Sequence, residues 1–470
     1  MPRDASPKYL QLARSFEHQL RAGVLRVGDR LPSIRQLREA HRISAATAVA
    51  CYLWLERQGY VRARPKSGYF VARTPAPEGP APGITRRVRG PVSVRVSGLA
   101  PAGVEPARGP VIDMGPAAVS PALLPVRRLN RSVRLALSAF SDHAVCYEDP
   151  SGSDRLRRQI ARLMFLQGVT CTADDVIVTS GSTEALHLAL RAITRPGDIV
   201  AIESPSCYES LQVLESLHLR ALEIPHIRHE GMDFAKLEAA ASRHRLAAIL
   251  TTATCHNPFG DCADDGAKAR LVAFATRHAI PIVEGDCFGD LVFVPPRPRS
   301  MKAFDTEGIV LHYSSLANHL APGFNLGWVH PGRWRAQVRH LKSLTNVASA
   351  RLPQLALAEF LESGALEAHL RDLRAALWRA VEAARNEVLR TFPAGTRVSQ
   401  PEGGWVLWVQ LPESFDGAEV VARAAAEGII ILPGIAFSAN GQYRNCIRLA
   451  CGHPVDVLVP AIRRLATLLV

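Results

Sequence analysis

Apolar residues recur at helical spacing in the first sixty residues of the chain. Residues 7–22, PKYLQLARSFEHQLRA, place four apolar positions on one helical face, and Gly23 ends the predicted helix. These positions are Leu10, Ala13, Phe16 and Leu20. Ser33 and Ser44 each precede a further stretch of the same kind, and serine is a favoured helix N-cap. The pattern therefore predicts three successive helices.

A strand-like hairpin follows the third helix, which Gly59 closes. The segment VRARPKSGYFVAR, residues 61–73, is typical of a strand, a Lys-Ser-Gly turn and a second strand. Three helices and a basic hairpin predict an α+β winged helix-turn-helix domain over residues 7–74.

Short apolar runs alternate with helical stretches beyond residue 110. The strand-like runs are DVIVTS, IVAIES, AAILTT and IPIVEG, and helical patterns such as STEALHLALRAI lie between them. This βαβ rhythm predicts a large α/β domain over residues 111–470, with a smaller α+β part near its C-terminus. Residues 75–110 are rich in Pro, Gly and Arg without periodicity, which indicates a linker.

Charge is concentrated at the N-terminus. The 470 residues carry a net charge of +13, and residues 1–75 hold 14 Lys and Arg against 5 Asp and Glu, 14 − 5 = +9. A small basic domain attached to a nearly neutral large one favours a polyanion as the partner of the basic domain.

The remaining composition favours a cytoplasmic protein. No uncharged apolar run is long enough to span a membrane, so we expect no membrane partner. Nine scattered cysteines without a CxxC pair are typical of a reducing compartment.

Several separated motifs in the first 75 residues resemble the GntR-type DNA-binding domain. GDRLPSIRQL, the helix from Ser44 to Tyr60 and RPKSGYFV occur in the family's order. The resemblance implies double-stranded DNA as the partner, with phosphate contacts from Ser33 and Arg35 and with Ser44, Thr47 and Tyr52 on or beside the groove-facing helix. It further implies a wing tip made of Lys66, Ser67 and Gly68. Ala45 stands where such helices often carry an arginine that reads bases.

The rest of the chain resembles aspartate-aminotransferase-like proteins of PLP fold type I, and the whole chain is similar to MocR regulators. The motifs, in order, are YEDPSGSDRLR, TSGSTEAL, IESPSCYESLQ, CHNPFG, VEGDCFGDL, SSLANHLAPGFNLGW, EGGWVLW and NCIRLACGHP. The resemblance implies a pyridoxal phosphate (PLP) type pocket built between two copies of the chain, and therefore a homodimer.

PLP chemistry requires a lysine amine, and the resemblance places Asn318 at that position. A carboxamide cannot condense with an aldehyde, so we expect no catalytic residue and no covalent cofactor. Asn325 replaces a phosphate-pairing arginine, and Phe288 replaces a tyrosine. The acid for the ring nitrogen is either Asp286 or lost at Gly285.

Other parts of the family pocket are retained. The resemblance assigns to the pocket Tyr147 from the partner subunit, Gly181, Ser182 and Thr183 at a helix N-terminus, Tyr208, Asn257, Ser315 and a carboxylate-binding Arg448. These residues imply a small-molecule effector that bears a carboxylate.

We therefore expect a DNA-binding transcriptional regulator with a degenerate aminotransferase-like domain. Two alternatives stay open: a regulator that binds PLP or a PLP–amino-acid adduct noncovalently, and, less favoured, an active aminotransferase. PLP binding is expected to be weak or absent, and no metal site is expected. Cys207, Cys255 and Cys287 fall in pocket loops, where they are either a thiol or metal sensor or, as we favour, fillers of space left by a lost cofactor.

Overall fold

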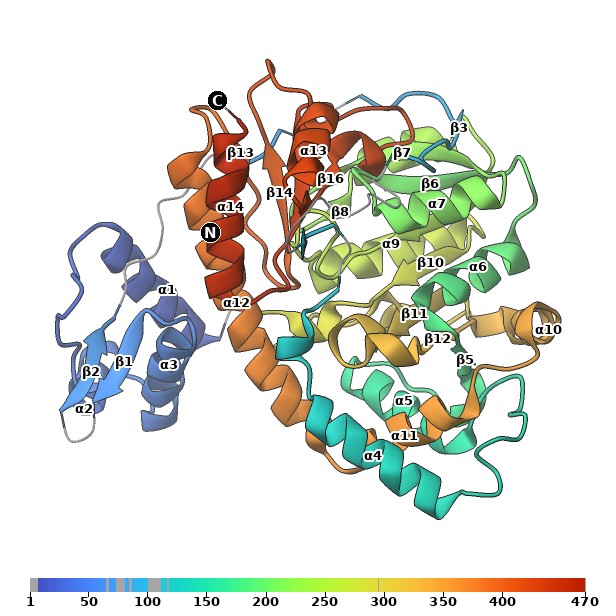
Figure 1. The fold of residues 1–470 in the computed structure, drawn as a ribbon, viewed down its shortest axis with the longest axis horizontal. Helices are drawn as coiled ribbons and strands as arrows, with labels where there is room; N and C mark the ends of the chain where they lie inside the picture. The colour runs from blue at the N-terminus through green and yellow to red at the C-terminus, as the bar shows by residue number, and fades with distance from the viewer. Residues whose placement is uncertain are drawn as a thin grey trace. The chain divides into compact units, whose positions relative to one another are not determined.

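The computed structural model describes residues 7–64, 67–72, 81–83, 87–99, 111–115, 118–294 and 296–469. Contacts divide the chain into two units, residues 1–79 and residues 80–470, which we call the N-terminal unit and the large unit (Figure 1). Among the described residues, no helix is long and apolar enough to cross a membrane.

The N-terminal unit is a winged helix-turn-helix, as predicted. Its elements are α1 (Lys8–Arg21), α2 (Ile34–His41), α3 (Ala45–Arg57), β1 (Val61–Arg64) and β2 (Gly68–Val71). Strands β1 and β2 are antiparallel, with Val61 opposite Val71. Phe16 and Leu20 of α1 are buried, as are Leu37 of α2 and Leu55 of α3. These side chains join the three helices because each comes from the apolar face of its own helix.

A mixed sheet forms the centre of the large unit. Among the described strands its order is β3-β7-β6-β9-β10-β11-β12-β5, with β8 paired to β7. The strands are β3 (Val92–Ser93), β5 (Ile177–Thr179), β6 (Ile199–Ser204), β7 (Arg220–Ile227), β8 (Gly231–Met232), β9 (Leu246–Thr251), β10 (Ile282–Gly285), β11 (Val310–Ser315) and β12 (Gly327–His330). From β7 to β11 neighbouring strands are parallel, and β12 is antiparallel to both of its neighbours.

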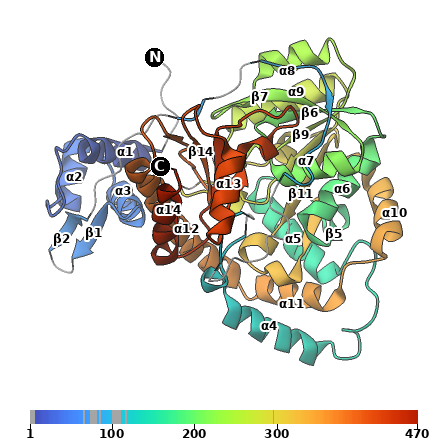
Figure 2. The same ribbon diagram turned by 45° about the horizontal axis from the view of Figure 1, so that its top comes forward.

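Helices cover both faces of this sheet (Figure 2). One core joins Val200 and Ile202 of β6 to α6 (Gly181–Ile193) and α7 (Tyr208–Ser216). A second core joins Ala201, between those two, to α8 (Phe234–Ala241) and α9 (Asp265–Arg277). Alternate residues of one strand thus enter opposite cores, as a parallel sheet buried on both faces requires.

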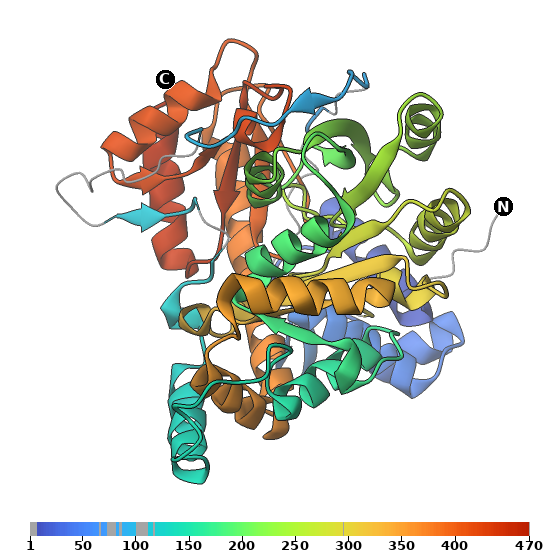
Figure 3. The ribbon, with the colours of Figure 1, turned by 90° about the vertical axis from the view of Figure 1, so that its right-hand side faces the viewer.

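A smaller α+β part follows toward the C-terminus. Its antiparallel sheet has the order β13-β14-β17-β16 and lies apart from the green and yellow strands in Figure 3. Its elements are β13 (Arg397–Val398), β14 (Val406–Gln410), β16 (Leu432–Pro433), β17 (Cys446–Ala450), α12 (Ala365–Thr391), α13 (Gly417–Ala426) and α14 (Val455–Thr467). β15 (Ile429–Ile430) pairs with β4 (Ile112–Asp113). The remaining α-helices are α4 (Val126–Ala139), α5 (Asp154–Leu166), α10 (Arg335–Asn346) and α11 (Arg351–Glu362).

Part of the predicted linker belongs to the large unit, which corrects the expectation for residues 87–99. Strand β3 pairs with β7, and Val94 and Val96 are buried in the core beneath α6 and α7. The backbone N–H of Val96 donates to Glu215 at 2.8 Å. A two-residue strand carries too little periodicity to be recognised in a sequence.

Candidate functional site

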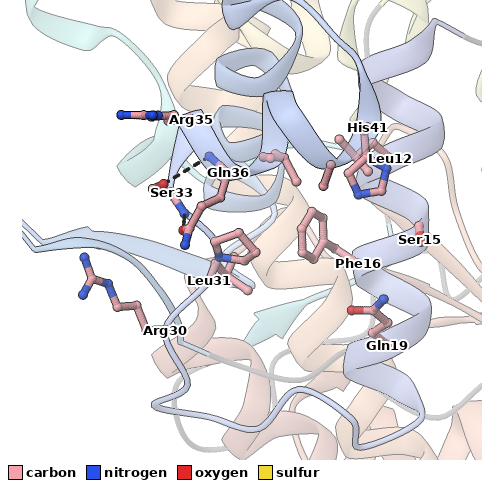
Figure 4. Close-up of a pocket in the computed structure, with 13 residues that line it drawn as sticks. Leu12, Ser15, Phe16, Gln19, Arg30, Leu31, Ser33, Arg35, Gln36 and His41 are labelled. Carbon is pink, nitrogen blue, oxygen red and sulfur yellow. Dashed lines mark hydrogen bonds between the residues drawn. The ribbon is translucent and has the colours of Figure 1, made fainter.

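Helix α2 begins with a complete capping box. The Ser33 side chain accepts from the backbone N–H of Gln36, and the Gln36 side chain accepts from the backbone N–H of Ser33 at 2.8 Å. Arg30 and Arg35 extend outward on either side of this cap, at one end of a groove of about 970 Å³ (Figure 4). Arg35 is well exposed, and it forms an i,i+4 ion pair with Glu39 at 3.0 Å. A helix N-terminus flanked by two guanidinium groups suits a phosphate.

Helix α3 begins at Ser44, whose side chain accepts from the backbone N–H of Thr47 and lies 2.8 Å from its hydroxyl. Ser44 is exposed and Thr47 half-buried. Tyr52 lies on α3, as expected, but its burial corrects the prediction that it takes part in DNA binding. Tyr52 is fully buried, its hydroxyl donates to the carbonyl of Pro32, and burial raises its pKa well above the usual range. It therefore fixes α3 to the start of α2 from inside the unit.

The predicted wing tip is described only in part. Ser67 and Gly68 are exposed, and Gly68 has φ +99°, which favours glycine at the entry to β2. Lys66 lies outside the described residues.

A cavity of about 230 Å³ lies in the large unit, at the ends of several sheet strands. Its lining residues include Ser182, Thr183, Cys207, Glu209, Thr252, Asn257, Gly285, Cys287, Phe288, Tyr313, Ser315, Asn318 and Asn325. Six residues predicted for a pocket thus line one cavity: Ser182, Thr183, Asn257, Ser315, Asn318 and Asn325. No lysine is among the described residues that line it.

The other predicted pocket residues lie elsewhere. Gly181, φ +80°, starts α6 so close to Asn325 that a Cβ would lie 2.3 Å from Oδ1 of that residue. Tyr208 is buried in the core beside α6, and its hydroxyl accepts from Gln212 at 3.0 Å. Tyr147 is 86% exposed. It is available to a second copy of the chain.

Asp286 does not face the cavity, which corrects that prediction. Its carboxylate forms an ion pair with Arg297, which also pairs with Asp290. Gly285 lines the cavity instead, and a Cβ there would lie 2.5 Å from the Tyr313 hydroxyl oxygen. The Tyr313 phenol thus occupies the space that any side chain at position 285 would need.

The N-terminus of α6 contains an internal ion pair. Glu184 accepts from the backbone N–H of Ser180 at 2.6 Å and from the Lys342 amine at 2.8 Å. Lys342, which is buried, also donates to Ser349 at 2.9 Å. The lysine therefore compensates the negative charge of Glu184.

Arg448 lies fully buried behind the cavity. One of its Nη atoms donates to the carbonyl of Gly115, whereas Nε and Nη1 have no hydrogen-bond partner among the described residues. Burial lowers the pKa of Arg448, and the neighbouring Glu209 and Cys207 act in the opposite direction. Both neighbours line the cavity.

Two cavity residues were missed by the sequence analysis. Glu209 accepts from the Cys207 thiol at 2.8 Å, and Cys207 in turn accepts from Asn257 Nδ2 at 3.4 Å. Tyr313 lies in the buried strand β11, outside the motifs quoted from the sequence. Glu209 lies within the pocket motif IESPSCYESLQ, so its place there was a usable signal.

Comparisons with known proteins agree with both units. Residues 8–71 match the family model described as bacterial regulatory proteins, gntR family, and residues 132–465 match aminotransferase class I and II. The chain is 35% identical to the uncharacterized HTH-type transcriptional regulator YjiR of Escherichia coli (strain K12), covering 96% of both chains. It is 34% identical to YdcR, another uncharacterized HTH-type transcriptional regulator of that strain, over 94% of both.

A solved aminotransferase resembles the large unit. The kynurenine aminotransferase of Pyrococcus horikoshii aligns with a TM-score of 0.72 at 26% identity, covering 78% of this chain and 92% of that one. The predicted fold class is therefore confirmed. The chain belongs to the HTH-type transcriptional regulators that join a GntR domain to an aminotransferase class I and II domain, the arrangement of MocR-type regulators.

Proposed function

We propose that this regulator binds operator DNA through residues 7–73 and that its large unit senses a small carboxylate-bearing molecule without covalent PLP chemistry. The observation that carries the proposal is a family cavity lined by Asn318 and by no described lysine. The protein is then no enzyme. A cytoplasmic location follows from the same function, since its target is DNA.

The buried lysines of the large unit already have partners. Lys268 donates to Thr254 and to the carbonyl of Arg299, and Lys302 donates to Asp305 and to the carbonyl of Val310. Lys342 is held by Glu184 and Ser349. An amine already bound in this way is poorly placed to attack an aldehyde in the cavity.

The cavity residues do not fit PLP as an electron sink. An acid must reach the pyridine nitrogen, yet Gly285 has no side chain, the Tyr313 hydroxyl occupies the space next to it, and Asp286 is committed to Arg297. Phe288, at the cavity wall, offers no hydroxyl. We derive no catalytic step through this cofactor.

A noncovalent PLP site has one observation in its favour. Ser182 and Thr183 open α6 at the cavity, where helix N–H groups favour an anion. Two observations argue against a noncovalent PLP site. Asn325 fills the space beside Gly181 without supplying a positive charge for the phosphate. Glu184 already accepts from the backbone N–H of Ser180. Weak, reversible binding is the expectation.

Arg448 supports the carboxylate part of the proposal. A buried guanidinium with two unpartnered nitrogen atoms, Nε and Nη1, is costly unless an anion pairs with it. A carboxylate reaching Arg448 from the cavity would supply that anion, and a bidentate Arg–carboxylate pair gives orientation as well as affinity.

Borohydride trapping tests the absence of covalent chemistry. The full-length protein is incubated with PLP, reduced and digested, and we expect no pyridoxyl-lysine at any cavity position. Asn318→Lys tested alone should trap PLP inefficiently. Gly285 and Tyr313 still supply no acid to the pyridine nitrogen. A stoichiometric adduct on one lysine of the unaltered protein would overturn the proposal.

A second experiment tests the sensor. Operator binding is measured by fluorescence anisotropy while a panel of small carboxylates is added, and at least one should change the affinity in the unaltered protein. Arg448→Gln should abolish that response. Arg444→Gln, which changes a largely exposed arginine of the same subdomain that pairs with Asp416, is the matched control. A response that survives Arg448→Gln would remove Arg448 from the site.

A further inference from the structure

A buried cluster of histidines and carboxylates lies outside the chemistry described so far. Glu203 lies next to the last residue of β6, His226 lies in β7, and His256 follows β9. All three are at most 2% exposed. One ligand atom from each lies within 4.8 Å of the other two. The parallel order of β7, β6 and β9 brings three distant segments together at one end of the sheet.

The separations within this cluster are too long for hydrogen bonds. His226 Nδ1 lies 3.6 Å from Glu203 Oε1, and His256 Nε2 lies 3.7 Å from Glu203 Oε2. His226 Nδ1 has no hydrogen-bond partner although it is buried. Ligand atoms that share a tetrahedral ion at bond lengths near 2.1 Å are about 3.4 Å apart, so the two His–Glu pairs need to close by only a few tenths of an ångström. The ligand atoms of His226 and His256 lie within 4.8 Å of each other.

The surrounding groups hold the candidate ligands in place. The other ring nitrogen of His226, Nε2, lies 2.9 Å from Asp261 Oδ2, which is the carboxylate–histidine–metal relay that fixes tautomer and ring orientation at zinc sites. Glu203 accepts from the Thr251 hydroxyl at 3.1 Å and from the Thr252 backbone N–H at 3.0 Å.

The charge of the cluster is incomplete without a cation. Glu203 and Asp261 are buried carboxylates, and among the described residues neither has a Lys or Arg side chain within ion-pair distance. Two carboxylates beside two neutral imidazoles carry a net charge of −2, which one divalent ion brings to zero.

We infer that Glu203, His226 and His256 form a binding site for a divalent transition-metal ion, most suitably Zn²⁺, with Asp261 as a positioning residue behind His226. Two imidazoles and one carboxylate are a common zinc ligand set that leaves a fourth position open. This inference revises the sequence-based expectation of no metal site. It does not depend on the proposed sensor function.

The site adjoins the cavity but uses none of its cysteines. Thr252, which donates to Glu203, and Asn257, next to His256, both line the cavity. An ion at the cluster would therefore hold one cavity wall in place. Cys255 and Cys262, with sulfur atoms 3.9 Å apart, offer a softer site nearby, so the test must separate the two.

The experiment uses the full-length protein, stripped with a chelator, dialysed and titrated with Zn²⁺. We expect one tightly bound ion per chain by elemental analysis after desalting, and a rise in melting temperature with Zn²⁺. His226→Asn and His256→Gln should each lose the ion, whereas Asp261→Asn should weaken binding roughly 10–100-fold. The control His244→Gln, at a histidine outside the cluster, should keep it.

An absorbance spectrum of the unaltered protein with Co²⁺ identifies the ligand type even if a variant fails to fold. Tetrahedral d–d bands without sulfur-to-cobalt charge transfer are expected. A charge-transfer band would place the ion on cysteine and overturn the inference. The inference would also be overturned if the unaltered protein failed to retain Zn²⁺ at micromolar concentration. Full retention of Zn²⁺ by both His226→Asn and His256→Gln would overturn it as well.

Discussion

The phenol of Tyr313 sets the character of the cavity. Its oxygen lies where a Cβ on residue 285 would come within 2.5 Å, so Gly285 and Tyr313 are sterically coupled. Burial raises the pKa of Tyr313 well above its usual range, and the phenol stays neutral. At this position the cavity presents a hydroxyl group instead of a carboxylate, which suits an anionic or neutral ligand.

Arg35 carries a residue-scale prediction for DNA binding. Arg35→Ala should weaken binding to all duplexes by roughly 1–3 kcal/mol and reduce the salt dependence by about one phosphate contact, because its contact is with the backbone. Fluorescence anisotropy at several salt concentrations measures both effects. Arg158→Ala is a matched control, since Arg158 is a similarly exposed helical arginine in an i,i+4 pair, with Asp154. Equal loss in both variants would contradict the prediction.

His319 carries a residue-scale prediction for pH. Burial lowers its pKa from 6.5 to about 4, and neither ring nitrogen has a hydrogen-bond partner among the described residues. The unfolded chain therefore binds a proton between pH 6.5 and 4 that the folded chain does not, and stability falls as the pH falls through that window. Burial lowers the pKa of His330 in the same direction, to about 3.

Melting temperatures between pH 4.5 and 7.5 test this effect. His319→Gln should flatten the acid side of the curve, whereas His143→Gln, at an exposed histidine, should leave its shape unchanged. An unchanged slope in His319→Gln would show that other groups control the acid response.

At the scale of elements, the start of α6 depends on a buried ion pair. Glu184→Gln leaves Lys342 charged, buried and without its anion, so we expect a loss of about 3 kcal/mol in the free energy of unfolding. The double variant Glu184→Gln/Lys342→Met should regain part of this loss, because no charge is then left unpaired. Urea unfolding monitored by circular dichroism provides the measurement. Equal stability of all three proteins would mean that the pair contributes nothing.

Elements with strong periodicity were predictable from the sequence. The buried strands β6, β9 and β10 appear as apolar runs, and α2 and α3 begin at serine caps that the sequence displays. Interactions between distant segments were not predictable. Tyr52 looked available to DNA because helical spacing does not say which face α3 buries, and the partner of its hydroxyl is the carbonyl of Pro32, twenty residues away.

The candidate site divides in the same way. Asn318, Asn257 and Ser182 were predictable because each belongs to a recognisable local motif. The ion pair of Asp286 with Arg297 was not predictable, because Arg297 lies in a loop eleven residues further along the chain. The cluster joins Glu203 and His226 of two strands to His256 of the loop after a third, so no single stretch of sequence contains its ligand spacing.

At the scale of the whole molecule, we predict a homodimer formed through the large unit. Val145 and Tyr147 are 90% and 86% exposed, which is unusual for large apolar side chains in a folded monomer. Tyr147→Ala should leave the fold intact and weaken the response to any cavity ligand, because the partner subunit would no longer complete the cavity. Analytical ultracentrifugation at micromolar concentration gives the oligomeric state. A stable monomer would contradict both statements.

The pairing of β3 with β7 limits how far the DNA-binding units can reach. Ala72, the end of the described N-terminal unit, and Val92 in β3 are twenty residue-to-residue steps apart, 92 − 72 = 20. Fully extended, they span at most about 66–72 Å. In a dimer, Ala72 of each N-terminal unit must lie within this distance of the anchoring strand on its own subunit. Once one half-site is bound, the second unit searches a small volume at an effective concentration on the order of millimolar. Half-site spacing is thereby selected by tether length as well as by base sequence.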